Sequence, residues 1–145
     1  MIILKRIEKN NVGKSLRFLE NVYSPPLSKR IPNYNQYINK LENSAFNYGA
    51  FFKDEIVGFI SFYANNTVSK EAYITQLVVK QAKQKMGIGK ALIILCKEEA
   101  KNAGMETLRL EVRKNNGNAI CFYKKMGFQF EDEKEESIYM RCQLK

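Results

Sequence analysis

The chain has 145 residues, the usual size of one domain, so we expect a single domain spanning residues 1–145. It has 24 Lys and Arg against 15 Asp and Glu, a net charge of +9, and no His, which excludes a Ser-His-Asp triad, a Cys-His dyad and a histidine metal site within this chain. Its three scattered cysteines form no CxxC pair, so we expect no bound metal, no disulfide framework and a reducing, cytoplasmic location.

The first half of the chain predicts four strands and two helices. Alternating or β-rich runs predict strands over residues 2–6, 48–52, 56–63 and 72–79, and apolar residues at helical spacing predict helices over residues 10–23 and 34–41. The three prolines, Pro25, Pro26 and Pro32, lie between the two helices and predict a loop there, because proline fixes φ and lacks an N–H donor. Residues 53–55 predict a hairpin turn.

The second half predicts helices over residues 88–103 and 119–126 and strands over residues 107–113, 128–130 and 137–142. Gly104 and Gly127 follow the helices, where a helix stop is expected. The acidic residues 131–136 predict a solvated hairpin turn. The helix between strands 72–79 and 107–113 predicts a right-handed crossover between parallel strands, whereas the other pairs look antiparallel. The predicted fold class is therefore a mixed α/β sheet in three layers.

The strongest chemical signal is QKMGIGKA over residues 84–91. Glycines there open a long helix, whose first turn presents backbone N–H groups and the positive end of the helix dipole. Lys80, Lys83, Lys85 and Lys90 add positive charge, so the turn predicts a site for phosphate or pyrophosphate. It is neither a P-loop nor a dinucleotide fingerprint, since positions 84, 91 and 92 lack the residues that those motifs need. A glycine-opened helix with a solvated lysine loop is the alternative.

A second block follows strand 107–113. Asn116, Ala119-Ile120, Tyr123 and Gly127-Phe128 match the pattern N-x-x-A-I-x-x-Y-x-x-x-G-F, and residues 84–89 match Q/R-x-x-G-x-G/A. Together the two blocks resemble the GNAT superfamily of N-acetyltransferases, and the order of elements agrees over nearly the whole chain. The resemblance implies a central, mostly antiparallel sheet with one parallel strand-helix-strand crossover and helices on both faces.

The resemblance also implies acetyl-CoA as cofactor and direct transfer of the acetyl group to a primary amine in a ternary complex. The backbone of residues 84–90 would hold the pyrophosphate, the strand end at 77–79 would pair with the pantetheine amides, and Asn116 would contact the cofactor arm. The cofactor-binding residues implied are Leu77, Val78, Val79, Gln84, Lys85, Met86, Gly87, Ile88, Gly89, Lys90, Asn116, Ala119 and Phe122.

Two side chains are candidates for proton transfer. An alkylamine is mostly protonated at neutral pH and must lose a proton before it attacks, and the departing thiolate benefits from a proton donor. Tyr123 occupies the family's tyrosine position and is the candidate acid, although its spacing alone favours a core aromatic. Glu111 is the candidate base, because related ribosomal-protein N-terminal acetyltransferases have a similarly placed L-E-V glutamate. An ion pair of Glu111 with a neighbouring arginine is the alternative, as is a base on the preceding strand acting through water.

The acceptor is less well specified. Tyr23, Arg30, Tyr34 and Tyr73 are candidate substrate residues, and they suit a small amine, such as an amino sugar or a nucleotide-linked amino sugar. The alternatives are an acetyltransferase of protein N-termini or lysines and a non-catalytic CoA-binding module. The lysines are dispersed and the apolar runs are short, so we expect no nucleic-acid and no membrane partner, and either a monomer or a homodimer.

Overall fold

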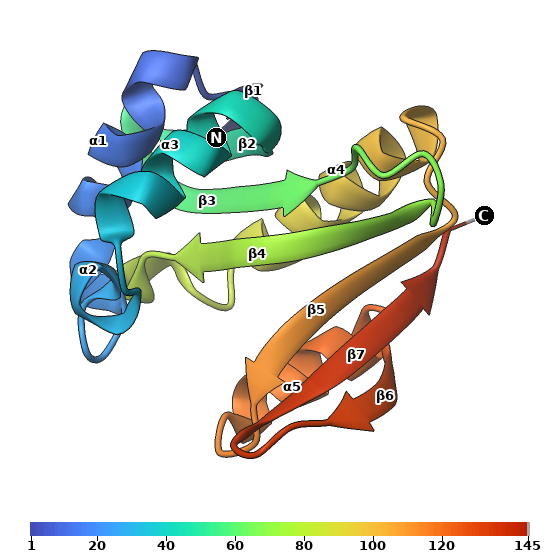
Figure 1. Cartoon of the computed structure of the whole chain (residues 1–145). Helices are drawn as coiled ribbons and strands as arrows, with labels where there is room; N and C mark the ends of the chain where they lie inside the picture. Colours follow the sequence, from blue (N-terminus) through green and yellow to red (C-terminus); the bar gives the residue numbers. More distant parts are fainter. Residues whose placement is uncertain (145) are drawn as a thin grey trace. The chain divides into compact units, whose positions relative to one another are not determined.

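The computed structural model describes residues 1–144 of the chain. Its helices and strands are β1 (Ile2–Arg6), α1 (Val12–Phe18), α2 (Leu27–Arg30), α3 (Tyr34–Ser44), β2 (Phe46–Phe52), β3 (Glu55–Tyr63), β4 (Glu71–Val79), α4 (Ile88–Asn102), β5 (Thr107–Arg113), α5 (Gly117–Lys125), β6 (Gln129–Glu133) and β7 (Ser137–Gln143). The strands form a mixed sheet in the order β1-β2-β3-β4-β5-β7-β6 (Figure 1). The predicted mixed α/β class is confirmed.

The chain divides into two compact units, each with its own contacts. Unit 1 comprises Met1–Phe62 and Gln76–Leu92, and unit 2 comprises Tyr63–Thr75 and Ile93–Lys145. β4 and α4 therefore contribute residues to both units. No helix within residues 1–144 is long and apolar enough to cross a membrane.

The sheet of unit 1 is built from antiparallel pairs. β1 pairs with β2 and β2 with β3, with Asn47 opposite Ser61. Lys53 and Asp54 between β2 and β3 have φ values of +50° and +66°. Positive φ at both central residues is the signature of a type I′ turn, whose twist matches the flanking strands. The predicted hairpin is confirmed.

The helices of unit 1 differ from the prediction for residues 10–23. α1 covers only Val12–Phe18 and is flanked by 3-10 turns at Lys9–Asn11 and Glu20–Val22. The helix ends at Phe18, because the backbone of Leu19 leaves α-helical geometry, with φ −97° and ψ 5°, while the Leu19 side chain is only 1% exposed. The predicted proline loop also contains the short helix α2, because Leu27 after Pro26 is buried and needs a compact backbone. Figure 1 shows α1 and α3 beside each other.

A buried polar pair connects α3 to the sheet of unit 1. Asn47 and Ser61 are both buried, and the Ser61 hydroxyl donates to Asn47 Oδ1 at 2.6 Å. The Asn47 amide donates to the carbonyls of Leu41 at 3.0 Å and Ala45 at 3.2 Å. The last carbonyls of a helix lack intrahelical partners, so this side chain satisfies the end of α3 and fixes it against β2.

Unit 2 contains the predicted parallel pair. The first half of β4 runs parallel to β5, with Glu71 opposite Thr107, and β7 lies antiparallel between β5 and β6. Leu108, Leu110 and Val112 are buried, as the alternation of β5 predicts. The prediction that residues 131–136 form a solvated turn is wrong in its first part, because β6 extends to Glu133.

Candidate functional site

The glycine turn of residues 84–89 closes onto the end of β4 and opens α4. Gln84 donates its side-chain amide to the Val79 carbonyl at 2.9 Å, which holds the two ends of the turn together. Gly87 has φ +82°, and a Cβ there would have no neighbour within 4 Å among the described residues. Its carbonyl accepts the N–H of Ala91 at 3.0 Å, so the hydrogen-bonded ladder of α4 starts at this glycine. The start of α4 is therefore open to a close-approaching anion.

Close packing fixes α4 at the turn. Ile88, the first residue of the helix, is 2% exposed. A Cβ on Gly58 of β3 would lie 3.0 Å from Ile88 and 3.3 Å from Leu92, so a glycine is needed for α4 to approach the strand this closely. The N-terminus of the helix is thus held on β3 by contacts on its buried side, while Met86 and Lys90 on the other side are exposed and Gly89 is half-buried.

The lysines around the turn fall into two pairs. The Lys80 ammonium forms an ion pair with Glu55 at 2.5 Å and lies over the Phe18 ring, and the Lys83 ammonium lies over the Phe52 ring. These two cations are neutralised or occupied at the β2–β3 hairpin and α1. Lys85 and Lys90 are exposed and form no ion pair within residues 1–144. Since a ring does not neutralise a cation, the positive field at the turn comes from Lys83, Lys85, Lys90 and the helix, and only Lys80 of the four expected lysines is neutralised within the described chain.

The end of β4 leads directly into this turn. Val78 is buried, whereas Leu77 and Val79 on the opposite face are half-buried. The N–H of Lys80 donates to the Val57 carbonyl of β3 at 2.8 Å, so β3 holds the chain at the point where the strand ends.

In unit 2, the start of α5 is capped by Asn116. Its side-chain oxygen accepts the N–H of Ala119 at 3.2 Å, which satisfies one of the helix's unpaired donors. Asn116 is exposed, and Ala119 and Phe122 are half-buried. The capping role was not anticipated from the sequence, although Asn followed by a helical pattern is a regular signal for it.

Tyr123 sits one turn further along α5. Its ring makes edge contacts with Phe122 and Phe128, with ring centres 5.4 and 5.7 Å away. Burial raises the pKa of Tyr123 to about 12. The phenol is therefore protonated at neutral pH, as a proton donor must be, and the same ring also packs as the core aromatic that its spacing predicts.

The carboxylate that pairs with arginine in unit 2 is Glu131, which was expected in a solvated turn, and not Glu111. Arg109 donates to Glu131 at 2.6 Å and packs on the Tyr139 ring, and Arg141 donates to Glu131 at 3.0 Å. The hydrogen bond from Arg109 lowers the pKa of Glu131, partial burial opposes this, and Arg141 lowers it further. Glu111 lies exposed on β5 opposite Tyr139, and it forms no ion pair within the described chain. The alternative that Glu111 neutralises Arg109 is therefore wrong.

A hydrogen-bonded cluster in unit 1 brings two of the acceptor candidates together. The Tyr23 hydroxyl donates to Gln76 Oε1 at 2.6 Å, and Gln76 Nε2 donates to the Tyr37 hydroxyl at 2.9 Å. The guanidinium of Arg30 lies over the Tyr23 ring at 5.6 Å. We call Tyr23, Arg30, Tyr37 and Gln76 the tyrosine–glutamine cluster. No motif in the sequence marks Gln76, which is the polar residue on the β4 face that carries Ala72, Ile74 and Val78.

The other two acceptor candidates are not part of this cluster. Tyr34 begins α3, and burial followed by the nearby Glu20 raises its pKa. Tyr73 is a half-buried residue of β4 in unit 2, opposite Arg109 of β5. Tyr37 of the tyrosine–glutamine cluster also contributes to the raised pKa of Tyr34, so Tyr34 lies near that cluster.

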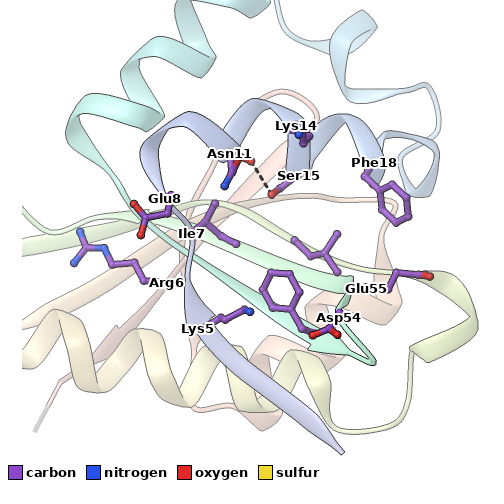
Figure 2. Close-up of a pocket in the computed structure, with 12 residues that line it drawn as sticks. Lys5, Arg6, Ile7, Glu8, Asn11, Lys14, Ser15, Phe18, Asp54 and Glu55 are labelled. Carbon is purple, nitrogen blue, oxygen red and sulfur yellow. Dashed lines mark hydrogen bonds between the residues drawn. The ribbon is translucent and has the colours of Figure 1, made fainter.

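A cavity of about 750 Å³ lies in unit 1, between β1, α1 and the β2–β3 hairpin (Figure 2). Charges of both signs line it, with Lys5, Arg6 and Lys14 on one hand and Glu8 and Asp54 on the other. None of the residues predicted for the cofactor or the acceptor lines this cavity. Two of its lining residues, Phe18 and Glu55, contact the Lys80 side chain. Its size alone does not make it the catalytic site.

Comparisons with known proteins match the whole arrangement. The model of the acetyltransferase (GNAT) family matches residues 15–128. The probable N-acetyltransferase san of Drosophila melanogaster is 31% identical over 127 residues, covering 85% of this chain and 66% of san. The ribosomal protein bS18-alanine N-acetyltransferase of Escherichia coli K12 is 35% identical over 68 residues, covering 47% of this chain and 46% of that protein. The chain thus spans less than two thirds of either relative.

A solved structure shows the same fold over nearly its full length. The PaiA N-acetyltransferase of Thermoplasma acidophilum, crystallised with coenzyme A, superposes with a TM-score of 0.78 at 18% identity, covering 99% of both chains. At this identity the likeness is one of fold. The expected antiparallel sheet with one parallel crossover is thereby confirmed as a fold seen in acetyltransferases.

Proposed function

This chain belongs to the acetyltransferase (GNAT) family, and from that premise we propose that it transfers the acetyl group of acetyl-CoA directly to a primary amine of a small molecule. The observation that carries the proposal is the open glycine turn at the start of α4, in a chain whose α5 tyrosine is protonated at neutral pH. The family match extends over residues 15–128 without interruption, which supports a single catalytic domain.

The turn fits the diphosphate of acetyl-CoA. A phosphate oxygen approaches closest where no Cβ intervenes, and Gly87 leaves that space empty. The N–H groups of the first turn of α4, with Lys85 and Lys90 beside them, would hold the negative charge. Acetyl-CoA supplies the activated acetyl thioester. Leu77 and Val79 would pair through their backbone with its amide groups, and Phe122 and Ala119 would pack against it.

Proton transfer is assigned to two side chains. Glu111 would accept a proton from the ammonium form of the acceptor, and its freedom from any arginine partner in unit 2 leaves the carboxylate available. Tyr123 would donate its phenolic proton to the leaving thiolate. Its raised pKa keeps the phenol protonated at neutral pH, but it also makes this transfer less favourable than from a solvent-exposed tyrosine. Neither step needs a metal or an acyl-enzyme.

The acceptor amine would enter beside the tyrosine–glutamine cluster. Tyr23 and Tyr37 present hydroxyls on either side of Gln76, one residue before the strand segment proposed for the pantetheine. Amino sugars are rich in groups that such a cluster can bind. A protein α-amine is the second candidate, because one relative bears the name of a ribosomal-protein alanine N-acetyltransferase.

Calorimetric titration with acetyl-CoA tests the cofactor, with ATP and NAD as controls. We expect selective micromolar binding of acetyl-CoA; a folded protein that binds none refutes the proposal. Thiol release with a panel of small amines and of peptides with free N-termini then tests the acceptor. Turnover of peptides alone would replace the small-molecule acceptor by a protein one, and binding without turnover of any amine would indicate a CoA-binding module.

A further inference from the structure

Arg30 occupies a position that the short helix α2 creates. Pro26 fixes the backbone before the helix, Leu27 anchors it in the core of unit 1, and Arg30 is its last residue. The side chain is half-buried and turns back over the chain that precedes the helix. Its Nη2 donates to the Ser24 carbonyl at 3.2 Å, and the guanidinium lies over the Tyr23 ring. These contacts hold the cation in one place.

The guanidinium has a donor that the protein does not use. Arg30 Nε is buried and has no hydrogen-bond partner anywhere in residues 1–144. No carboxylate of the described chain forms an ion pair with Arg30. Glu20, which lies next to α2, accepts hydrogen bonds from the backbone N–H and the hydroxyl of Ser28 instead. A buried donor on a permanent cation is costly to leave without an acceptor.

The neighbours of Arg30 connect it to the acceptor side of the site. Tyr23, on which the guanidinium is stacked, donates its hydroxyl to Gln76 of β4. Gln76 immediately precedes the strand segment Leu77–Val79 that we assign to the cofactor arm. A ligand bound at Arg30 would therefore lie beside Tyr23, with its other end directed toward Gln76.

We propose that Arg30 selects acceptor amines that carry a second, anionic group, either a carboxylate or a phosphate. The planar guanidinium would offer N–H groups to two oxygens of that group, the bidentate geometry in which arginine binds both kinds of anion. The amine of the same molecule would lie toward Gln76 and the end of β4. This inference rests on the proposed acetyltransferase activity and specifies its substrate class.

Matched amines test the proposal by steady-state thiol release. Tyrosine is compared with tyramine for the carboxylate, and phosphoethanolamine with ethanolamine for the phosphate. We expect the anionic member of at least one pair to have the higher kcat/KM, and the pair that responds identifies the anion. Arg30→Gln should raise KM for that member about 10- to 100-fold and leave its neutral counterpart within 2-fold. Arg30→Lys keeps the positive charge but loses the planar pair of N–H donors, so its KM for the anionic amine should lie between those of the wild type and Arg30→Gln.

Lys29→Gln is the matched control, because it removes the same charge from the exposed neighbouring position. Lys29→Gln should change the KM of the anionic amine and that of its neutral counterpart by less than 2-fold each. Equal kcat/KM within both pairs, or equal effects of Arg30→Gln and Lys29→Gln, would overturn the proposal while leaving the acetyltransferase activity intact. If acetyl-CoA binds but no amine turns over, thermal shifts with the same pairs decide. A shift by the anionic member that Arg30→Gln abolishes supports the proposal, and no such shift refutes it. Failure to bind acetyl-CoA refutes the proposed function instead.

Discussion

The glycine turn and the tyrosine–glutamine cluster both lie in unit 1, but they are built from different parts of the chain. The turn uses backbone: a positive φ at Gly87, an uncovered N–H face and one side chain, Gln84, that closes the loop. The cluster uses side chains from a loop, from α2, from α3 and from β4. A backbone site admits few residue types at its critical positions, whereas a side-chain site can change its chemistry at every position. This explains why the cofactor half has a recognisable motif and the acceptor half does not.

The largest expected effect tests the backbone character of the turn. Gly87→Glu would place a side chain and a negative charge in the space above the start of α4. We expect affinity for acetyl-CoA to fall at least about 100-fold by calorimetry, since both bulk and charge oppose a diphosphate.

Gly104→Glu is the control for Gly87→Glu. Gly104 has φ +89° and open space around it, so the substitution adds the same charge and a similar backbone strain, about 1–2 kcal/mol, at the other end of α4. It should lower the melting temperature at least as much as Gly87→Glu, because a negative charge is unfavourable at the C-terminal end of a helix, and it should leave affinity unchanged. Equal affinity in both variants would mean that the diphosphate binds elsewhere.

The next largest effect is expected on kcat, and not on the affinity for acetyl-CoA, when Tyr123 of unit 2 is changed. Tyr123→Phe removes one hydroxyl and should lower kcat about 100-fold or more, while affinity for acetyl-CoA stays within 2-fold. Tyr48→Phe, in the core of β2, is the control and should leave kcat unchanged. A wild-type kcat in Tyr123→Phe would remove the phenol from the mechanism.

The same variant tests the raised pKa. The folded pKa of about 12 exceeds the ordinary 10, so the neutral phenol favours the fold below pH 10 and this contribution is lost as the pH rises toward 12. The wild type should therefore lose stability relative to Tyr123→Phe over that interval, measured by chemical unfolding. Parallel stability curves would show that the hydroxyl is accessible to water.

Two glutamates of unit 2 allow a comparison between a reactive and a structural carboxylate. Glu111→Gln should lower kcat about 10- to 100-fold with no change in stability, because the exposed carboxylate has no ionic partner in unit 2. Glu131→Gln should instead cost about 1 kcal/mol of unfolding free energy, because it releases Arg109 and Arg141. The pKa of Glu131 is lowered in the fold, so its contribution is present at neutral pH and lost as the pH falls below its ordinary value of 4.5. Reversed results would exchange the two assignments.

The sequence predicted the elements whose signals are local. β5 alternates over its whole length, Gly104 and Gly127 stop the two helices with positive φ, and the turn of residues 84–89 needs a glycine where the structure has φ +82°. The failures are of another kind. The predicted helix over residues 10–23 is interrupted at Leu19, whose backbone leaves α-helical geometry although its side chain is buried, as the helical spacing predicts. The sequence predicts a solvent-exposed Glu131, because its arginine partners lie on other strands. Gln76 could not be identified as a site residue, because its hydrogen-bond partners Tyr23 and Tyr37 are distant in the sequence.

The smallest expected effect tests whether Asn116 only caps α5 or also contacts the cofactor. Its side chain caps α5, which is a structural duty, but its family position implies contact with the cofactor. Asn116→Ala should cost about 1 kcal/mol of stability through the lost cap, and Asn116→Asp should restore it, because aspartate caps as well as asparagine. If the cap is the only duty, both variants keep wild-type affinity for acetyl-CoA. If the amide also reaches the cofactor, affinity falls several-fold in both variants, and more in Asn116→Asp because its charge repels phosphate. We expect the second pattern, since an exposed cap still has an amide group that the helix does not use.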